Sequence, residues 1–102
     1  MAHLLQTIKK RSTFLMIQKS GKISFGKAFN VQFFGDNTLN NTIFVGFTAT
    51  KKIGKAVKRN KAKRIMRQLS RKVISKYGKK NSYYVLIAKS SIFEIPFHSQ
   101  EI

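Results

Sequence analysis

The spacing of apolar residues predicts one long amphipathic helix in the second half of the chain. After Gly54, apolar side chains recur at helical spacing and, at about 100° per residue, fall on one side of a helix. These residues are Ala62, Ile65, Met66, Leu69 and Val73. The polar and cationic residues close to the opposite side are Asn60, Lys63, Arg64, Arg67 and Arg71. We therefore expect a helix that buries one side, exposes cations on the other and ends at Tyr77-Gly78.

Shorter segments with alternating apolar residues indicate β-strands. The candidates are residues 23–25, 28–34 and 42–50. A turn-rich loop at residues 35–41 connects the last two, so we expect them to pair as an antiparallel hairpin. Residues 82–89 are apolar almost throughout, which is typical of a central strand.

Both ends of the chain have weaker patterns. Residues 1–11 end in three consecutive cations and are expected to form a mobile or loosely docked basic arm. Ser12 is suited to cap a short helix that Gly21 ends. The tail at residues 90–102 contains Pro96 and has only a weak helical pattern. The order α-β-β-β-α-β predicts an α+β fold, a two-layer sandwich in which the long helix packs on one sheet, in a single domain of 102 residues.

The charge of the chain is extreme. It has 21 Lys and Arg residues against three carboxylates, a formal net charge of +18, and such a molecule repels itself unless a polyanion neutralises it. No acidic residue lies between Asp36 and Glu94, so the long helix lacks the i,i+4 ion pairs that stabilise a solvated charged helix. Its arginines supply forked donors suited to phosphate. Nucleic acid is the expected partner, and an anionic membrane surface comes second on charge alone.

Side chains suited to catalysis are scarce. The acids are Asp36, in a predicted turn, and Glu94 and Glu101 in the tail, whereas a two-metal nuclease needs several converging carboxylates. The two histidines lie near opposite ends of the chain, and the absence of cysteine excludes disulfides and thiolate metal sites. We therefore expect no catalytic site and no metal site in the polypeptide itself.

RNA binding is better supported by the residues. Exposed aromatic rings stack on unpaired bases, and the candidates are Phe14, Phe34, Phe44, Tyr83 and Tyr84. The alternative is that most of these rings belong to the core. No apolar run approaches the length of a membrane span, and the apolar stretch near the N-terminus is too short for a secretory signal. A cytoplasmic protein without membrane contact is therefore expected.

The segment that enters the long helix resembles a family signature. It reads Lys51-Lys52-Ile53-Gly54-x-Ala56-Val57-x-Arg59-Asn60-x-x-Lys63-Arg64-x-x-Arg67-Gln68. This run is similar to the signature of the protein component of bacterial ribonuclease P. Matches at Phe14, Gly21, Phe29 and Val45-Gly46 extend the resemblance over residues 9–90.

The resemblance implies a function and a set of site residues. In that family a catalytic RNA removes the 5′ leader from precursor tRNA with bound Mg²⁺, and the protein binds the RNA and helps to hold the leader. The chain is thus expected to be the protein subunit of an RNA-catalysed endoribonuclease, monomeric in a 1:1 complex, with Mg²⁺ held mainly by the RNA. The expected RNA-binding residues are Lys51, Lys52, Lys55, Lys58, Arg59, Asn60, Lys61, Lys63, Arg64, Arg67 and Arg71. The expected leader-binding cleft contains Phe14, Asn30 and Gln32.

Three features depart from the family pattern. Lys61 stands where the family often has an arginine, and Gln18 and Gln32 stand where it often has cleft aromatics. The family usually closes with a further helix, but only 13 residues follow Lys89. We expect this helix to be short or absent and the cleft to be more open.

Two other functions fit part of the pattern. A structural RNA-binding protein, such as a ribosomal component of similar fold, has the same size, charge and architecture, and only the spacing of the signature separates it. A cationic membrane-active or DNA-compacting protein is expected to spread its charge over many faces without a sheet core. The apolar strands at residues 29–33 and 85–88 argue against this last class.

Overall fold

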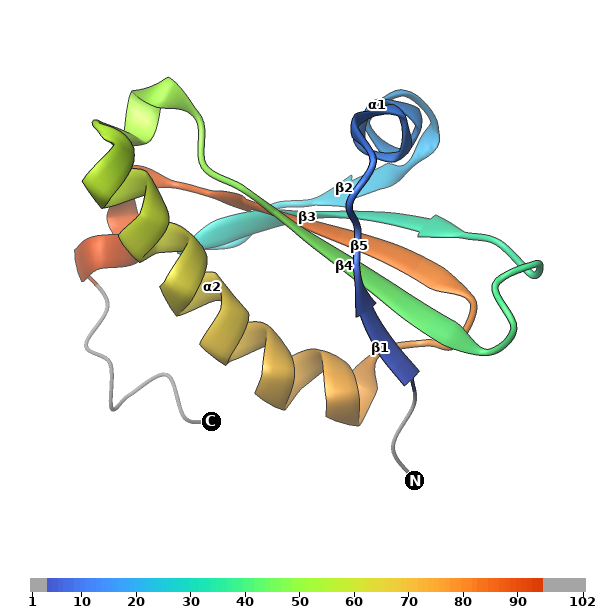
Figure 1. Ribbon diagram of the computed structural model, residues 1–102. Coiled ribbons are helices and arrows are strands. Elements are labelled where there is room, and N and C mark those ends of the chain that lie inside the picture. Colours follow the sequence, from blue (N-terminus) through green and yellow to red (C-terminus); the bar gives the residue numbers. More distant parts are fainter. Residues whose placement is uncertain (1–3, 95–102) are drawn as a thin grey trace.

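One mixed β-sheet with a helix against each face organises the chain (Figure 1). The structure is a computed structural model that describes residues 4–94, apart from the side chains of residues 4, 72, 73 and 75–77. The elements in chain order are β1 (Leu4–Thr7), α1 (Arg11–Ser20), β2 (Lys22–Ser24), β3 (Phe29–Gly35), β4 (Thr42–Thr48), the 3-10 helix η1 (Lys51–Ile53), α2 (Ala56–Tyr77), β5 (Ser82–Ala88) and the 3-10 helix η2 (Ser90–Glu94). The predicted α+β class is confirmed.

The strand β5 is the centre of the sheet, whose order is β1-β4-β5-β3-β2. It pairs antiparallel with β3 and parallel with β4, and β1 and β2 form the two edges. Val85 contributes to the core on one face of the sheet, and Leu86 and Ala88 contribute to the core on the other. The prediction of a central strand in this segment is therefore confirmed.

The predicted hairpin of β3 with β4 is wrong, because β5 lies between these strands. Asn81 holds the start of β5 in this gap. Its N–H donates to the carbonyl of Thr42 at 3.0 Å, and its side-chain oxygen accepts the N–H of Asn41 at 2.9 Å. The N–H of Asp36 donates to the carbonyl of Asn81 at 2.8 Å. The loop between β3 and β4 thus spans an intervening strand that is apolar on both faces and needs a neighbour on each edge.

Two hydrophobic cores lie on opposite faces of the sheet, because side chains alternate along each strand. The core under α2 contains Ala28, Ile43, Val45, Ile53, Ala62, Met66, Ile74, Leu86, Ala88 and Ile92. The smaller core under α1 contains Ile8, Ile17 and Val85. The helix α2 runs along the length of its face, whereas α1 crosses the strands and covers only part of the other (Figure 1). The face of the sheet on which α1 packs, which we call the α1 face, is therefore largely not covered by a helix.

The first described residues differ from the expected basic arm. Leu4–Thr7 is a strand that pairs parallel with β4. Ile8, which follows it, is 6% exposed, and its N–H donates to the carbonyl of Val45 at 2.9 Å. These residues supply hydrogen-bond partners to an edge of β4 that would otherwise be unpaired. The segment is therefore part of the sheet and not a loosely docked arm.

The first helix begins two residues earlier than expected. Lys10 occupies the N-cap position of α1, and its carbonyl accepts the N–H groups of Thr13 and Phe14. The prediction of Ser12 as the N-cap is therefore wrong, because the helical hydrogen bonds already begin at the carbonyl of Lys10. Gly21 ends the helix as predicted.

The long helix α2 is present as predicted, and Gly78 ends it by donating its N–H to the carbonyl of Ile74 at 2.7 Å. The buried side chains are Ala62, Met66, Ser70 and Ile74, and Ile65 and Leu69 are half-buried. Val73, expected on the same side, lies outside the described side chains. Ser70 was not expected there, and its hydroxyl is satisfied by donating to the carbonyl of Arg67 at 3.0 Å.

The last described element is η2, which follows β5 directly. Ile92 at its centre is fully buried in the core under α2. The short or absent C-terminal helix was expected in residues 90–102, of which residues 90–94 form η2 and residues 95–102 lie outside the described part of the chain.

Candidate nucleic-acid interface

A fixed turn leads into α2. Ile53 donates its N–H to the carbonyl of Thr50 at 3.0 Å, and Gly54 donates to the carbonyl of Lys51 at 3.1 Å. The side chain of Ile53 anchors the turn in the core. Gly54 has a φ of 137°, which residues with a side chain rarely adopt. Lys51 and Lys52 are thus exposed on a rigid turn.

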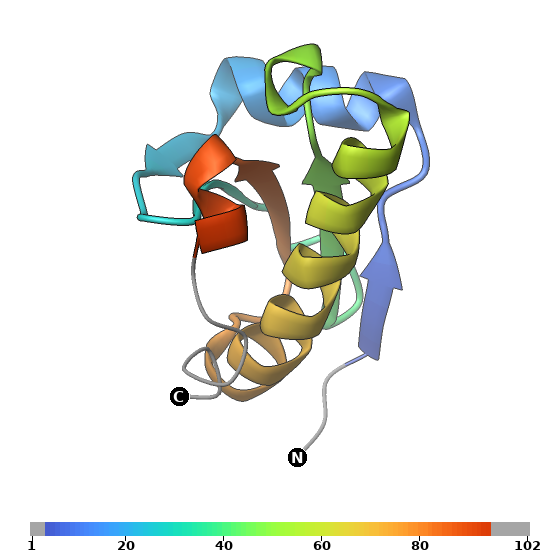
Figure 2. The same ribbon diagram turned by 90° about the vertical axis from the view of Figure 1, so that its left-hand side faces the viewer.

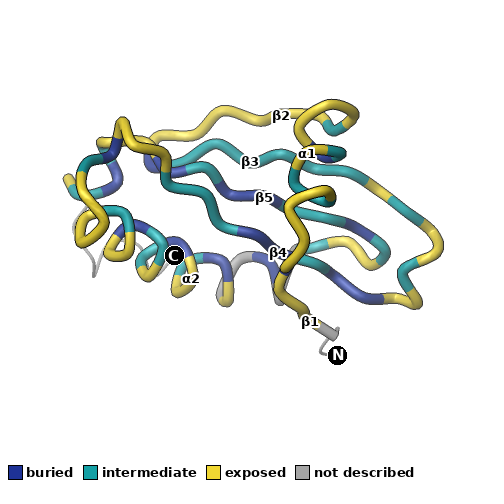
Figure 3. Tube along the Cα trace, turned by 45° about the horizontal axis from the view of Figure 1, so that its top comes forward, coloured by how far each residue is buried: buried dark blue, intermediate teal, exposed yellow. Residues whose placement is uncertain are grey.

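The predicted RNA-binding residues lie along this turn and along the outer side and flanks of α2, and we call this set the basic ridge. Figure 3 shows that exposed positions recur along the turn and α2. The exposed members are Lys51, Lys52, Lys55, Lys58, Asn60, Lys61, Arg64, Arg67 and Arg71. Arg59 and Lys63 are half-buried. The guanidinium carbon of Arg67 lies 5.8 Å from the ring centroid of Phe47, which favours one orientation of this side chain.

The acidic side chains of the described residues lie outside the basic ridge. Asp36 is in the loop before β4, whereas the turn of the ridge follows β4. The hydroxyl and the N–H of Thr38 donate to Asp36 at 2.6 and 3.0 Å, and these hydrogen bonds hold the pKa of Asp36 below its ordinary value. Glu94 is exposed at the end of η2. The ridge itself contains no acid, so its cations reinforce one another in attracting an anion.

An open hollow of about 570 Å³, which we call the first hollow, lies between the turn before α2 and the end of β5. Its lining residues are Asn30, Thr50, Lys51, Lys52, Ile53, Ile87, Ala88, Lys89 and Ser90. The ammonium group of Lys89 donates to the carbonyl of Gly26 at 2.7 Å, and the N–H of Gly26 donates to the side-chain oxygen of Asn30 at 3.3 Å. The first hollow thus combines a partly apolar floor, a fixed amide and cations at its rim, which suits a single-stranded polyanion.

A second hollow of about 460 Å³ lies between α1, the end of β4 and α2. Its lining residues are Lys9, Arg11, Phe14, Leu15, Gln18, Phe47, Thr48, Ala49 and Lys63. Thr48 of the second hollow pairs with Ile87 of the first, and Ile87 pairs in turn with Asn30. One row of the sheet therefore connects the two hollows.

The three residues predicted for the leader cleft share one face of the sheet but not one hollow. Phe14 lines the second hollow, and Asn30 lines the first. The ring of Phe14 lies on Gly46, where an added Cβ would be 2.5 Å from it. Gln32 is in the neighbouring row, opposite Val85, and is half-buried.

The structure adds cations that the predicted site did not include. Lys9 and Arg11 line the second hollow, and Lys89 lines the first. The available signals were the run of cations before the first helix and the cation at the end of the central strand. Neither signal shows, without the sheet register, that these residues flank the same surface as the basic ridge.

Most of the aromatic candidates for stacking belong to clusters within the sheet. All five are half-buried. Phe44 stacks on Tyr83 with ring centroids 5.4 Å apart, and Phe34 lies 6.3 Å from Tyr83 on its other side. Tyr84 points to the opposite face, against Phe33. Phe14 is thus the candidate that lines a hollow next to the basic ridge.

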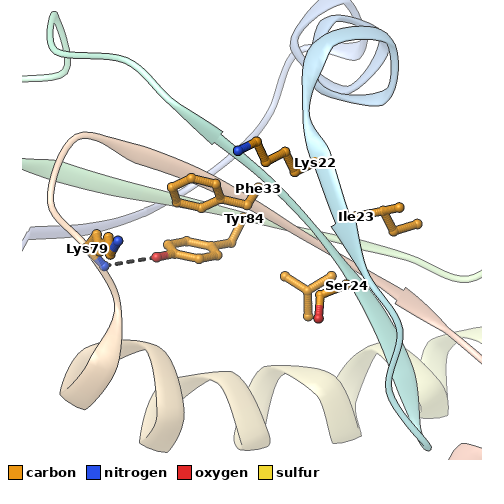
Figure 4. Close-up of a pocket in the computed structure, with 7 residues that line it drawn as sticks. Lys22, Ile23, Ser24, Phe33, Lys79 and Tyr84 are labelled. Atoms are coloured by element: carbon orange, nitrogen blue, oxygen red, sulfur yellow. Dashed lines mark hydrogen bonds between the residues drawn. The ribbon is translucent and has the colours of Figure 1, made fainter.

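A third hollow, of about 630 Å³, lies on the α2 face, away from Phe14 and Asn30. Figure 4 shows the rings of Phe33 and Tyr84 at its floor, and the hydroxyl of Tyr84 accepts the N–H of Lys79 at 2.9 Å. Lys22 and Ile23 of β2 border it. It has no wall in common with either hollow of the α1 face.

The described residues offer little to protein-based catalysis or to a membrane. Among them no three His, Asp or Glu side chains gather in a way that could hold a metal ion. None of the described helices is both long and apolar enough to cross a bilayer. What the surface does provide is a dense set of cations on a rigid support.

The fold and the basic ridge define a small, strongly basic α+β protein with a surface typical of nucleic-acid-binding proteins. The sequence model of the family described as ribonuclease P matches residues 4–101. The ribonuclease P protein components of Caulobacter vibrioides and Syntrophus aciditrophicus are both 40% identical, over 84 and 86 residues, which is 82% and 84% of this chain. The chain belongs to the ribonuclease P protein family.

Solved structures agree with this assignment. The ribonuclease P protein of Staphylococcus aureus has a TM-score of 0.76 at 25% identity, covering 93% of this chain and 84% of that one. The protein of Thermotoga maritima has a TM-score of 0.73 at 28% identity, covering 93% and 87%. The aligned chain spans 56% of the length of the Caulobacter relative and 70% of the Syntrophus one.

Proposed function

We propose that this chain is the protein subunit of ribonuclease P, which removes the 5′ leader from precursor tRNA. The polypeptide binds the catalytic RNA and the leader, and the RNA carries out the hydrolysis. The observation that carries the proposal is the surface formed by the family signature, in which a rigid turn and the outer side and flanks of one helix present eleven predicted RNA-binding residues, nine of them exposed and two half-buried. Because these cations lie together without an acid among them, a phosphate backbone is their natural partner.

The two RNA partners are assigned to two parts of the surface. The basic ridge binds the catalytic RNA, since it offers charge and forked donors on a regular helix. The leader lies in the cleft formed by the first and second hollows, where it meets the ring of Phe14 and the fixed amide of Asn30. A ring suits stacking on an unpaired base, and an amide suits a base edge. Gln32 lies beside Asn30 on the same face and extends this cleft.

The hydrolysis requires Mg²⁺, and the donor chemistry of the described residues does not fit a site for it. Mg²⁺ prefers several oxygen ligands including carboxylates, and the described acids are Asp36 in one loop and Glu94 at the end of η2. Mg²⁺ is therefore bound mainly by the RNA. The protein acts in the cytoplasm as a monomer in a 1:1 complex with the RNA.

Reconstitution tests the proposed function. The purified chain is mixed with a bacterial ribonuclease P RNA at low Mg²⁺, and cleavage of a precursor tRNA with a 5′ leader is measured against the protein alone and the RNA alone. We expect efficient cleavage only in the mixture. Tight RNA binding without stimulated cleavage, and with equal affinity for precursors with and without a leader, would instead identify a structural RNA-binding protein.

The leader cleft is tested by one matched pair of variants. Asn30→Ala removes the amide of the first hollow, whereas Asn37→Ala removes an exposed amide in the loop between β3 and β4. We expect Asn30→Ala to weaken binding of the precursor with a leader and to leave binding of mature tRNA unchanged. Asn37→Ala is expected to change neither. Equal effects of Asn30→Ala on both tRNA forms would contradict the placement of the leader in this cleft.

A further inference from the structure

The cations of the basic ridge have no carboxylate within α2, or in the turn before it, to orient them. Intrahelical ion pairs therefore do not limit their rotamers. A mobile lysine loses conformational entropy when it binds a phosphate, and this loss weakens binding. An aromatic ring from another part of the chain lies next to two of these lysines.

This ring belongs to Phe93 of η2. The backbone of η2 lies beside the first turns of α2 (Figure 2). Its centroid lies 5.7 Å from the Nζ atom of Lys58 and 5.9 Å from that of Lys61. Both distances are within the range of a cation–π interaction, about 6 Å. The two lysines are three residues apart, so one ring serves neighbouring cations on the same side of the helix.

Contacts on either side of η2 hold the backbone next to Phe93, and they do not depend on the lysines of α2. The preceding residue, Ile92, is fully buried, and its N–H donates to the carbonyl of Lys89 at 2.9 Å. The hydroxyl of Ser91 donates to the carbonyl of Lys27 in the turn between β2 and β3. These two contacts hold the backbone of η2 beside Phe93 before any RNA is bound.

Lys58 has a second contact that limits its movement. A Cβ at Gly54 would lie 3.0 Å from the Cδ atom of Lys58, so the aliphatic part of this lysine lies directly against the glycine backbone. Its ammonium group then reaches Phe93. The aliphatic part of Lys58 therefore packs against the turn, and its ammonium group contacts the ring of Phe93.

We propose that Phe93 is a positioning residue for RNA binding, which holds Lys58 and Lys61 in the orientation in which they meet RNA phosphates. This inference rests on the proposed RNA-binding function of the basic ridge. A carboxylate would orient the same lysines but would offset their charge and compete with the phosphate. The face of an aromatic ring attracts an ammonium group through its quadrupole, and it leaves the positive charge and N–H donors available.

Replacing Phe93 with pentafluorophenylalanine tests the proposal, because fluorination keeps the ring and its apolar contacts but reverses the quadrupole on which the attraction depends. We expect the affinity for ribonuclease P RNA to fall about three- to fivefold, since two lysines must then be ordered on binding. The slope of affinity against salt is expected to stay unchanged, because no cation is removed. Phe93→Tyr keeps the negative ring face and is expected to bind like the unmodified protein.

Two controls accompany this measurement. In a Lys58→Ala/Lys61→Ala background, fluorination of Phe93 is expected to have no further effect on affinity. Phe25 is 74% exposed in the turn between β2 and β3, and its fluorination is expected to leave RNA affinity unchanged. NMR of the RNA-free protein gives an independent readout, since ring currents shift the side-chain methylene signals of Lys58 and Lys61 upfield, and Phe93→Leu is expected to abolish these shifts.

The outcomes separate the inference from the function on which it rests. Equal RNA affinity of the fluorinated and unmodified proteins would overturn the positioning role while leaving RNA binding intact. The same loss in the Lys58→Ala/Lys61→Ala background would also overturn it, because the ring would then contact the RNA itself. If the unmodified chain shows the ring-current shifts but does not bind ribonuclease P RNA, the proposed function fails, and the RNA role of Phe93 fails with it.

Discussion

The missing side chain of Gly46 determines how closely α1 approaches the sheet. A Cβ at this position would lie 2.5 Å from the ring of Phe14 and 3.2 Å from Ile8. Because it is absent, the ring of Phe14 approaches the backbone of β4 closely at Gly46. The same ring lines the second hollow. The absence of a side chain at Gly46 therefore affects the shape of the cleft proposed for the leader.

Gly46→Ala is expected to displace Phe14 and to lower the free energy of unfolding by about 1–3 kcal/mol, the usual cost of an overpacked core position. Urea unfolding measures this. Gly35→Ala is the matched control in a strand, since the nearest atoms to its Cβ would be 4.0 Å away. An equal loss in both variants would mean that the contact with Phe14 is not the cause.

Asp36 gives the loop between β3 and β4 a pH dependence. Its pKa is lowered by the hydrogen bonds from Thr38, so its stabilising contribution is complete well above its ordinary pKa of 3.8 and is lost as pH falls through the lower pKa of the folded state. The stability difference between the unmodified protein and Asp36→Ala is therefore expected to be constant near neutrality and to shrink in strong acid. Chemical denaturation as a function of pH measures it. A difference that grows on acidification would contradict this assignment.

Among the elements, α2 and β5 follow from their own residues, whereas the pairing of the strands does not. The spacing of apolar residues predicts the buried side of α2, and the apolar run at residues 82–89 predicts a central strand. The composition of the loop at residues 35–41 predicts a turn. It does not show whether β3 and β4 pair directly or leave room for another strand between them. The four residues of β1 are too few to form a clear alternating pattern.

The candidate site divides in the same way. The basic ridge is contiguous in sequence, so the signature and the helical period predict it. The two hollows are assembled from segments far apart in the chain, and the row Thr48–Ile87–Asn30 connects them only through the register of three strands. Local patterns do not report such a register, and for this reason Lys9, Arg11 and Lys89 were absent from the predicted site.

Arg64→Ala tests the contribution of α2 to RNA binding. Arg64 is exposed on the ridge, so we expect weaker RNA binding, a salt slope shallower by about one unit at most, and little change in stability. Gln68→Ala, one turn later on the same helix and also exposed, is expected to leave the slope unchanged. Titrations at several salt concentrations measure both variants. A slope that Arg64→Ala does not alter would mean that this residue does not face RNA phosphate.

The whole molecule carries a net charge of +18 on 102 residues, and this charge opposes its own folding. Salt screens such repulsion over distances of about 10 Å at 0.1 M. The melting temperature of the free protein is therefore expected to rise between low and moderate NaCl, by about 4–8 °C for each kcal/mol of repulsion relieved. Differential scanning calorimetry checks this. A melting temperature that does not change with salt would mean that the charges are too far apart to repel significantly.

The central place of β5 also affects the order in which the protein can fold during synthesis. The strands β3 and β4 leave the ribosome first, yet each must wait for β5, which follows a 22-residue helix, to fill the gap between them. A nascent chain that has not reached residue 88 leaves the facing edges of both strands unpaired, and such edges promote aggregation. The cationic helix is already synthesised at that stage. During translation this protein is therefore exposed to cellular RNA before its own sheet has closed.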